Sequence, residues 1–297
     1  GSSGRLRGEQ GVLPRGDYMQ CLLGMMEYED QLEETITILR ERTDGDPLIN
    51  LLASRSEKRH HGVEGGIDGL RRLFRVRGKI IPVSLTDVDL VAKTKTGQII
   101  EMEHNIDGIK HDPTFKDRDE ITRIYFTNLA EPNPKAIKAI EDADKIVIPP
   151  GSPFTSIIPH LLVGDKQESI SKAILRSKAQ LIVVANLMTT LGEDHHMQLF
   201  SRWLTVFQHY LGDNQYIQEN RRSRINCLIA NTNHIDPEIL SLYQDERQTP
   251  VEIDEQECLS AVPGLQVIYE DLVKYDPISH LLRHHPDKLA RIVLSLS

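Results

Sequence analysis

The chain has 297 residues, of which 39% are hydrophobic, 27% charged and 5% aromatic, so it can bury a sizeable apolar core without disulfides. Its 35 basic and 44 acidic side chains give a net charge of −9, which disfavours nucleic acid as a partner. No apolar run approaches the ~20 residues that cross a bilayer, and no signal peptide opens the chain, so we expect a cytoplasmic protein with no membrane partner.

The first third of the chain is predicted to be helical, with one long loop. Residues 17–28 and 31–42 have the apolar spacing of two consecutive helices. Residues 54–69 are rich in glycine, charged residues and histidine, and this composition predicts a mobile loop.

The remaining chain alternates short strands with amphipathic helices. Strand-length apolar runs rich in β-branched residues occur at residues 79–84, 145–148, 181–185, 225–230 and 266–269. Apolar residues have the spacing of a helix at residues 134–142, 165–177, 194–211, 236–245 and 286–294, and these segments begin near an acidic residue or a proline. We therefore predict a single α/β domain over residues 1–297, with a Rossmann-like, doubly wound, mainly parallel sheet and helices on both faces. Residues 88–94 and 98–103 predict a β-hairpin added at the edge of that sheet.

The second predicted strand ends in a turn of small polar residues. It breaks at two prolines and Gly151, and Ser152, Thr155 and Ser156 follow before a helix is predicted to begin. Backbone N–H groups and the positive end of a helix dipole can bind an anion at such a turn, and the hydroxyls add donors. The alternative is that these residues only cap the helix, which is the commoner role of a Gly-Ser turn.

Two other predicted strands also end in polar residues. Asn186, Thr189 and Glu193 follow the third predicted strand, and Asn231 follows the fourth. Ligands of open parallel sheets bind beyond the carboxyl ends of the strands, and an asparagine amide can both donate to and accept from a base or a sugar. A single asparagine more often forms an ordinary turn, but three polar strand ends together favour a binding site.

Metal coordination and several familiar catalytic mechanisms find little support in the sequence. Histidine pairs occur at residues 60–61, 195–196 and 284–285, but neighbouring side chains on a helix point about 100° apart and chelate poorly from one face. We therefore expect no metal site. The three widely spaced cysteines are typical of free thiols in a reducing compartment. No H-E-x-x-H, G-x-S-x-G or Walker motif occurs.

Several of these segments resemble the CofD-like proteins of the 2-phospho-L-lactate transferase superfamily, which include the gluconeogenesis factors of the YvcK type. Residues 143–163 are similar to the family's A-D-x-I-V-x-G-P-G-S-x-x-T-S-I-x-P-N-L-L-V, with Pro149 and His160 where glycine and asparagine are usual. Residues 186–193 resemble its N-x-M-T-Q-x-G-E, and residues 76–83 resemble its V-R-G-x-V-L-P-V. The resemblance covers almost the whole chain.

The opening of the chain also matches this family, in its D-D-G-G-S-S-G-R-L-R segment. This match replaces the alternative that the first four residues are a tag remnant. It implies that Gly1, Ser2, Ser3 and Arg5 contact a ligand phosphate, with Arg5 as a bidentate donor. It also implies that the family's first strand and its glycine-rich phosphate loop would precede Gly1.

One family motif is altered in this chain. The family's G-H-x-x-G-N-L-L falls at residues 45–52, where Asp46 replaces the histidine and Ile49 replaces the second glycine. Asn50 is retained and is a further candidate site residue, as is Glu193. No role of the family's histidine can be transferred to Asp46, so catalysis is in doubt and no catalytic residue is assigned.

The resemblance implies two possible functions. Transferases of the family move a phospholactyl or phosphoenolpyruvyl group from a GDP-linked donor to a deazaflavin precursor, with magnesium assistance. YvcK-type members instead bind UDP-N-acetylglucosamine and regulate carbon use and cell shape. The segment at Gly151 is closer to the YvcK pattern than to the transferase's G-P-S-N-P-x-x-S-I, so we favour a regulatory protein that binds a nucleotide sugar. Such a protein could form a homo-oligomer. A non-binding interaction scaffold is the third alternative.

Overall fold

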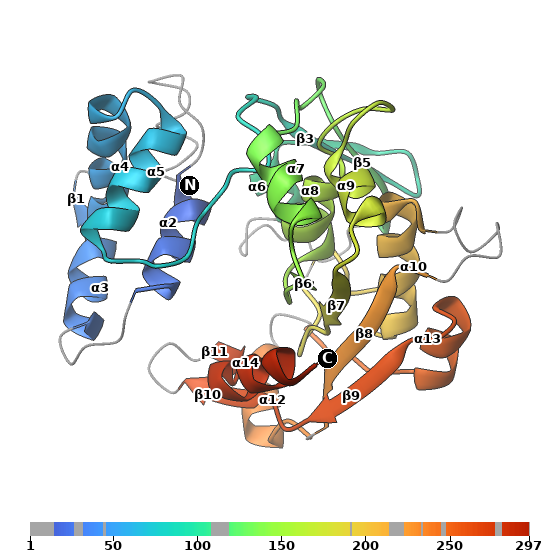
Figure 1. The fold of residues 1–297 in the computed structure, drawn as a ribbon. Helices are drawn as coiled ribbons and strands as arrows, with labels where there is room; N and C mark the ends of the chain where they lie inside the picture. The colour runs from blue at the N-terminus through green and yellow to red at the C-terminus, as the bar shows by residue number, and fades with distance from the viewer. Residues whose placement is uncertain are drawn as a thin grey trace. The chain divides into compact units, whose positions relative to one another are not determined.

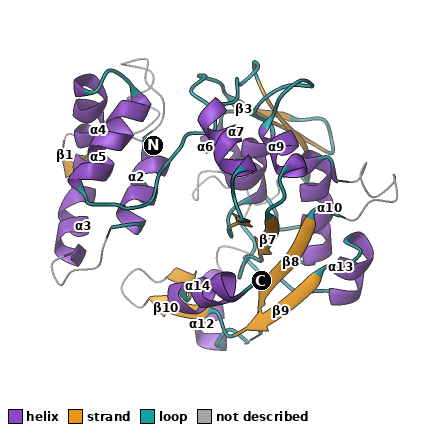
Figure 2. Ribbon diagram, in the orientation of Figure 1, coloured by secondary structure: helices purple, strands orange, loops and turns teal. Residues whose placement is uncertain are grey.

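The computed structural model describes residues 15–26, 32–43, 46–107, 119–190, 192–213, 223–232, 234–244, 248–276 and 281–296 (Figures 1 and 2). The chain forms two compact units, Gly1–Asp87 and Val88–Ser297, and each is described by itself. The single domain expected over residues 1–297 stays a prediction.

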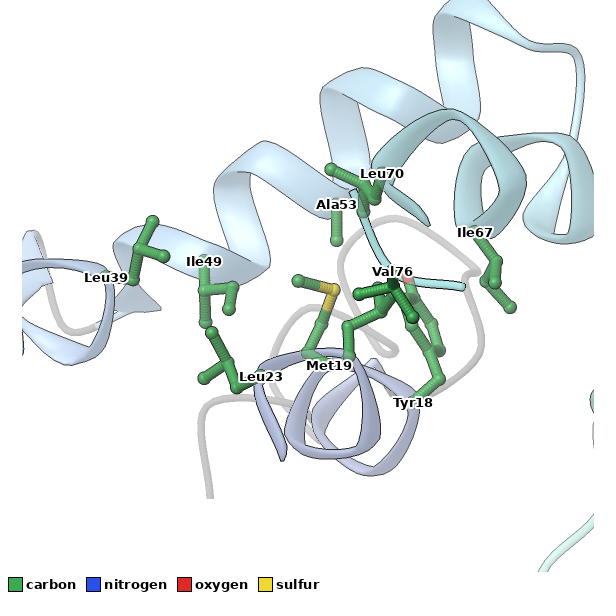
Figure 3. Close-up of a cluster of buried hydrophobic side chains, with 10 residues drawn as sticks. Tyr18, Met19, Leu23, Leu39, Ile49, Ala53, Ile67, Leu70 and Val76 are labelled. Carbon is green, nitrogen blue, oxygen red and sulfur yellow. The ribbon is translucent and has the colours of Figure 1, made fainter. Parts of the chain in front are cut away.

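Unit 1 consists mainly of helices. The described elements are α2 (Gly16–Gly24), α3 (Leu32–Arg40), β1 (Arg42–Thr43), β2 (Asp46–Pro47), α4 (Leu48–Arg59) and α5 (Val63–Leu73). The first two helices are those predicted near the start of the chain. Their apolar side chains gather with those of α4 and α5 in one buried cluster that includes Met19, Leu23, Ala53 and Leu70 (Figure 3).

Residues 54–69, expected to be a mobile loop, are instead helical at 54–59 and 63–69. The glycines that suggested a loop allow α5 to lie directly against α4. A Cβ added at Gly66 would lie 2.7 Å from Glu57 Cγ and 2.8 Å from Glu57 Cα. Glycine composition therefore reflects close helix packing here.

The predicted strand at residues 79–84 is wrong, because this segment forms no strand in the structure. Its two adjacent isoleucines are followed by Pro82, which has no N–H to donate to a ladder. The segment instead runs on from α5 toward the end of unit 1.

A buried ion pair joins the start of α2 to α4. The Arg15 guanidinium donates from Nε and Nη2 to Glu57 Oε2, at 2.9 and 2.7 Å, and the Tyr18 hydroxyl donates to Glu57 Oε1. Arg15 and Glu57 are only 3% and 8% exposed. Burial, together with the Glu57 carboxylate, raises the pKa of Tyr18 far above its usual value.

Glu57→Gln is expected to destabilise the protein by about 3 to 5 kcal/mol, because it leaves the buried Arg15 charge without a counter-charge. Urea denaturation followed by far-UV circular dichroism measures this loss. The control is Asp68→Asn, which removes an exposed partner of Arg71 and Arg72 and is expected to have little effect. A Glu57→Gln protein as stable as the Asp68→Asn protein would contradict the prediction.

The centre of unit 2 is a four-stranded parallel sheet in the order β6-β7-β8-β9. Its strands are β6 (Lys145–Ile148), β7 (Gln180–Val184), β8 (Ile225–Asn231) and β9 (Gln266–Glu270). They confirm four of the five parallel strands predicted from the apolar runs. The two central strands, β7 and β8, carry the near-continuous hydrophobic pattern that suits a sheet covered on both faces.

Helices alternate with the strands of unit 2. They are α7 (Pro134–Glu141), α9 (Ile170–Arg176), α10 (Phe200–Leu211), α12 (Pro237–Gln244), α13 (Glu255–Ala261) and α14 (Pro286–Ser295). α14 packs through Ile292 and Val293 onto a cluster that includes Ile182 and Ile229. All residues from Leu181 to Val184 of β7 and from Cys227 to Ala230 of β8 are buried, so both faces of these two central strands are covered, as predicted.

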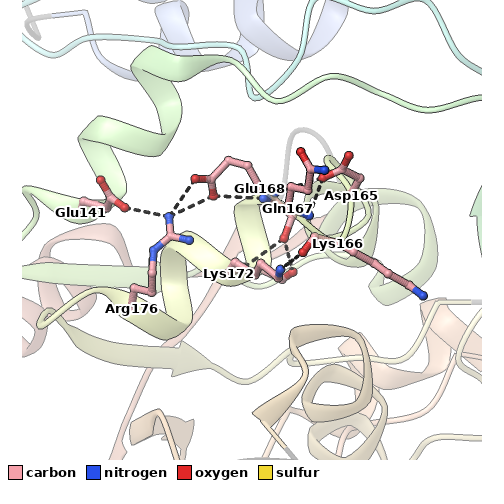
Figure 4. A network of polar contacts seen from close by, with 9 residues as sticks. Glu141, Asp165, Lys166, Gln167, Glu168, Lys172 and Arg176 are labelled. Carbon is pink, nitrogen blue, oxygen red and sulfur yellow. Dashed lines mark hydrogen bonds and ion pairs between the residues drawn. The ribbon is translucent and has the colours of Figure 1, made fainter.

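Helix α9 begins five residues later than predicted, because a polar turn precedes it (Figure 4). Asp165 Oδ1 accepts the N–H groups of Gln167 and Glu168 at 2.7 and 3.0 Å. Arg176 then bridges Glu168 and Glu141, at 2.9 and 2.8 Å, and so connects α9 to α7. The acidic residue that suggested a helix start closes a turn instead.

The predicted β-hairpin exists, but it does not lie at the edge of the parallel sheet. β3 (Leu90–Thr94) pairs with β4 (Ile99–Glu101) and also with β5 (Ile121–Phe126), giving a separate antiparallel sheet in the order β4-β3-β5. α6 (Glu103–Asp107) follows it. Side chains of this sheet pack against Phe154 and Ile158, so the sheet supports the segment that follows β6.

A second hairpin, which the sequence analysis missed, lies near the end of the chain. β10 (Val273–Asp276) and β11 (Leu281–His284) pair in antiparallel fashion just before α14. Figure 1 shows this hairpin beside the end of β9. Of the helices described, none is long and apolar enough to cross a membrane.

Candidate functional site

The carboxyl ends of β6, β7 and β8 meet at one edge of the parallel sheet. Ile148 is in register with Val183, and Val184 with Ile229. Gly151 and Asn186 follow β6 and β7 within three residues, and Asn231 is the last residue of β8. The sequence prediction that three polar strand ends share one edge therefore agrees with the structure.

Asn186 ties the end of β7 to the turn after β6. The Gly151 N–H donates to Asn186 Oδ1 at 2.8 Å, and Asn186 Nδ2 donates back to the Gly151 carbonyl at 2.9 Å. Two opposed hydrogen bonds from one planar amide hold Gly151 in a single orientation. The turn is therefore held rigidly where it leaves the sheet.

A buried carboxylate makes the second connection between these loops. Glu193, only 2% exposed, accepts the Thr155 hydroxyl at 2.7 Å and the Thr155 N–H at 3.2 Å. Thr155 lies in η2 (Pro153–Ile157), a single π-helical turn that leads into α8 (Ile158–Leu161). Such π turns are frequent at functional sites. The donors that the sequence analysis assigned to a phosphate at Thr155 thus bind the chain's own carboxylate.

The two serines of the turn differ in their surroundings. The Ser152 hydroxyl lies 3.5 Å from Thr190 Oγ1, at the outer limit of a hydrogen bond. The Ser152 carbonyl accepts the N–H groups of Ser156 and Ile157 at 3.0 and 3.1 Å, which closes the π turn. The Ser156 side chain is exposed. Of the two hydroxyls, only that of Ser152 is held near the end of β7.

Thr189 and Asn231 bond to other parts of unit 2. Thr189 is buried, and its Oγ1 accepts the Thr249 N–H at 3.0 Å. Asn231 Oδ1 accepts the Leu272 N–H at 3.0 Å, just before β10 begins. Both residues hold neighbouring segments in place, and their role in ligand binding stays a prediction.

Asp194 is a residue of this edge that the sequence analysis missed. Its side chain is 2% exposed and accepts the Thr190 N–H. Burial raises the pKa of Asp194 to about 7, an effect that the Thr190 N–H partly opposes. Perturbed carboxyls of this kind are concentrated at functional sites. The acidic pair Glu193-Asp194 after a predicted strand was the available signal.

The remaining candidate residues belong to the first 87 residues of the chain. Asn50 is buried on α4 of unit 1. Gly1, Ser2, Ser3 and Arg5 lie outside the described residues, so their predicted phosphate contacts stay predictions.

Metal ligands do not gather in the described ranges. No group of three or more histidine, cysteine, aspartate or glutamate side chains there could hold an ion. Magnesium, which a transferase would use, prefers carboxylate oxygens, but both oxygens of Glu193 are engaged by Thr155. The described part of the edge therefore does not fit that ion.

Comparison with known proteins shows the family. The family model for 2-phospho-L-lactate transferase CofD matches residues 1–273. A putative gluconeogenesis factor of Thermoanaerobacterium thermosulfurigenes is 32% identical, over 100% of this chain and 85% of the relative. The gluconeogenesis factor of Bacillus subtilis is 29% identical, over 100% of this chain and 86% of its own length.

A crystal structure gives the same result. A UPF0052 family member from Bacillus halodurans has a TM-score of 0.84 and 28% sequence identity, covering 99% of this chain and 88% of that protein. The family match, the curated relatives and the shared fold agree with one another. The chain is therefore a member of the CofD family, on the branch of the gluconeogenesis factors (the YvcK or UPF0052 type).

Proposed function

We propose that this protein is a cytoplasmic regulatory protein that binds a nucleotide sugar of the UDP-N-acetylglucosamine class at the carboxyl edge of β6, β7 and β8. The observation that carries the proposal is the direct bonding of the loops after β6 and β7, through Gly151 with Asn186 and through Thr155 with Glu193. These bonds preorganise polar groups at the place where open parallel sheets bind nucleotides.

The polar groups at this edge suit a ligand rich in hydroxyl and amide groups. After bonding Gly151, Asn186 still has a second Nδ2 hydrogen and a second lone pair on Oδ1 for a base or sugar. The Ser152 hydroxyl makes only a long contact with Thr190 and can turn toward a phosphate oxygen. A small polar ligand also agrees with the net charge of −9, which disfavours nucleic acid and anionic membranes.

Glu193 determines where the diphosphate lies. A phosphate oxygen at Thr155 would stand beside a buried carboxylate, and two like charges at that separation repel strongly. We therefore place the diphosphate on the Ser152 side of the turn. Thr155 then supports the turn and does not contact the ligand.

Ligand-dependent melting of the whole chain tests the proposal. UDP-N-acetylglucosamine at a hundred times its dissociation constant is expected to add about 2.7 kcal/mol of stability. The matching family model bears the transferase's description, so GDP and a deazaflavin are measured in parallel. A shift with these two and none with UDP-sugars would favour the transferase, and no shift with any of them would favour a scaffold.

Asn186→Ala is expected to weaken nucleotide-sugar binding at least tenfold, because it removes both hydrogen bonds that orient Gly151. Isothermal titration calorimetry measures the change. The matched control is Asn226→Ala, since Asn226 Oδ1 accepts the Leu181 N–H at 2.8 Å near the opposite end of β8. The control is expected to lose comparable stability and to keep its affinity. Equal affinity in both variants would show that Asn186 is only structural.

A further inference from the structure

A histidine from the second hairpin reaches the edge of the parallel sheet. His284 is the last residue of β11, and its Nε2 lies 2.9 Å from the carbonyl oxygen of Ala185, directly after β7. The two residues are 99 positions apart in the chain. The contact therefore brings an imidazole beside Asn186, in a part of the site that the sequence did not predict.

The ring lies at the point where the β7–β8 ladder ends. The Ala185 N–H donates to the Ile229 carbonyl of β8 at 2.9 Å, so the Ala185 carbonyl also points toward β8. His284 binds this carbonyl, which a longer ladder would have used. Asn186 directly follows Ala185 in the loop after β7, and Asn231 is the last residue of β8.

The base of the hairpin is anchored to the same edge. Asn231 Oδ1 accepts the Leu272 N–H at 3.0 Å, and the His285 N–H donates to the Leu272 carbonyl at 2.7 Å. These bonds hold the start of β10 and the end of β11 together at the end of β8. His284 is thus held in place by its own contact with Ala185 and by the contacts of the neighbouring His285 and Leu272.

The contact with Ala185 determines which nitrogen of the ring carries the proton. A carbonyl oxygen only accepts hydrogen bonds, so Nε2 is the donor. Burial lowers the pKa of His284 below its usual value, against a smaller opposing effect of the Ala185 carbonyl, and the ring is neutral at physiological pH. In that neutral ring Nδ1 has a lone pair and can only accept.

We propose that His284 is an additional ligand-binding residue of this site, where Nδ1 accepts a hydrogen bond from a hydroxyl group of the ribose or the sugar. The proposal rests on the proposed function. A lone pair repels phosphate oxygens, so His284 can recognise only a hydrogen-bond donor of the nucleotide sugar, and most of these donors are hydroxyl groups. His284 lies beyond residues 1–273, the part of the chain that the family model matches.

Three substitutions separate ligand binding from a structural role. The amide of His284→Gln can still donate to the Ala185 carbonyl, but it has no acceptor at the position of Nδ1. His284→Asn has the reverse pattern, with an amide near the position of Nδ1 and no reach to Ala185. His284→Ala loses both groups.

Calorimetric titration of each full-length variant with UDP-N-acetylglucosamine, and with UDP, is the measurement. We expect His284→Gln to melt at the same temperature as the wild-type protein and to bind the ligand about tenfold more weakly. We expect His284→Asn to melt at a lower temperature than the wild-type protein but to bind the ligand more tightly than His284→Gln does. A loss confined to UDP-N-acetylglucosamine places the contact on the sugar, and a loss with both ligands places it on the ribose. Wild-type affinity in His284→Gln would overturn the inference and leave the proposed function intact. A wild-type protein that binds neither ligand would overturn both.

Discussion

Asp194→Asn is expected to stabilise the protein, and the gain is expected to grow as the pH rises. Burial raises the pKa of Asp194 from 3.8 to about 7 in the folded protein. Between these two values the folded protein holds a proton that the unfolded chain has released, so the free energy of unfolding falls as the pH rises through this range. Asparagine keeps the shape and the bond to the Thr190 N–H but cannot ionise.

The difference in the free energy of unfolding between Asp194→Asn and the wild-type protein should increase by about 2 to 3 kcal/mol between pH ~5 and pH ~8. Urea denaturation at several pH values measures it. Asp165→Asn is the control, because backbone N–H groups of Glu168 and Gln167 lower the pKa of Asp165, and it is ionised throughout this range. Wild-type and Asp194→Asn curves that run parallel would show that Asp194 is already charged in the folded protein.

Asp194, which lowers the stability of the protein at neutral pH, lies at the candidate site. Asp194 holds the Thr190 N–H, and the Thr190 hydroxyl faces Ser152 in the turn that we assign to the diphosphate. Groups that cost stability are commonly kept where binding or chemistry needs them. Asp194→Asn therefore also tests whether this edge is built for a ligand, by titration with the same nucleotide sugar.

Gly164→Ala is expected to cost about 3 to 5 kcal/mol of stability. Gly164 lies between α8 and α9 with a φ of +107°, where L side chains are strained. A Cβ there would lie 2.3 Å from the Glu168 carbonyl oxygen and 2.4 Å from Ser169 Cα. These are backbone atoms of the turn that begins α9, and they cannot rotate out of the way.

Gly264→Ala separates backbone strain from steric overlap. Gly264 has a φ of +86°, but no atom lies within 4 Å of its added Cβ, so only strain of about 1 to 2 kcal/mol is expected. Denaturation followed by the fluorescence of Trp203, the single tryptophan, reports on unit 2 in both variants. Equal losses in the two variants would mean that the turn at Gly164 relaxes around the methyl group.

Patterns within one segment of sequence were enough to predict the parallel sheet and the place of the site. β6 to β9 are short apolar runs, and the continuous hydrophobicity of β7 and β8 reflects burial on both faces. Once these strands are parallel, their carboxyl ends share one edge, so the sequence is enough to group Gly151, Asn186 and Asn231. The added hairpin was also evident, because its turn residues and alternation are local signals.

Tertiary structure decided everything that depends on partners distant in the chain. β5 joins β3 in a separate sheet, Glu193 takes the donors of Thr155, and His284 reaches the end of β7, and none of these pairings leaves a periodic signal in the sequence. Glycines 65, 66 and 69, which by composition indicated a loop, serve helix contact instead. Side-chain periodicity reports which face of a segment is buried, whereas the identity of the group that covers it is determined only when the chain folds.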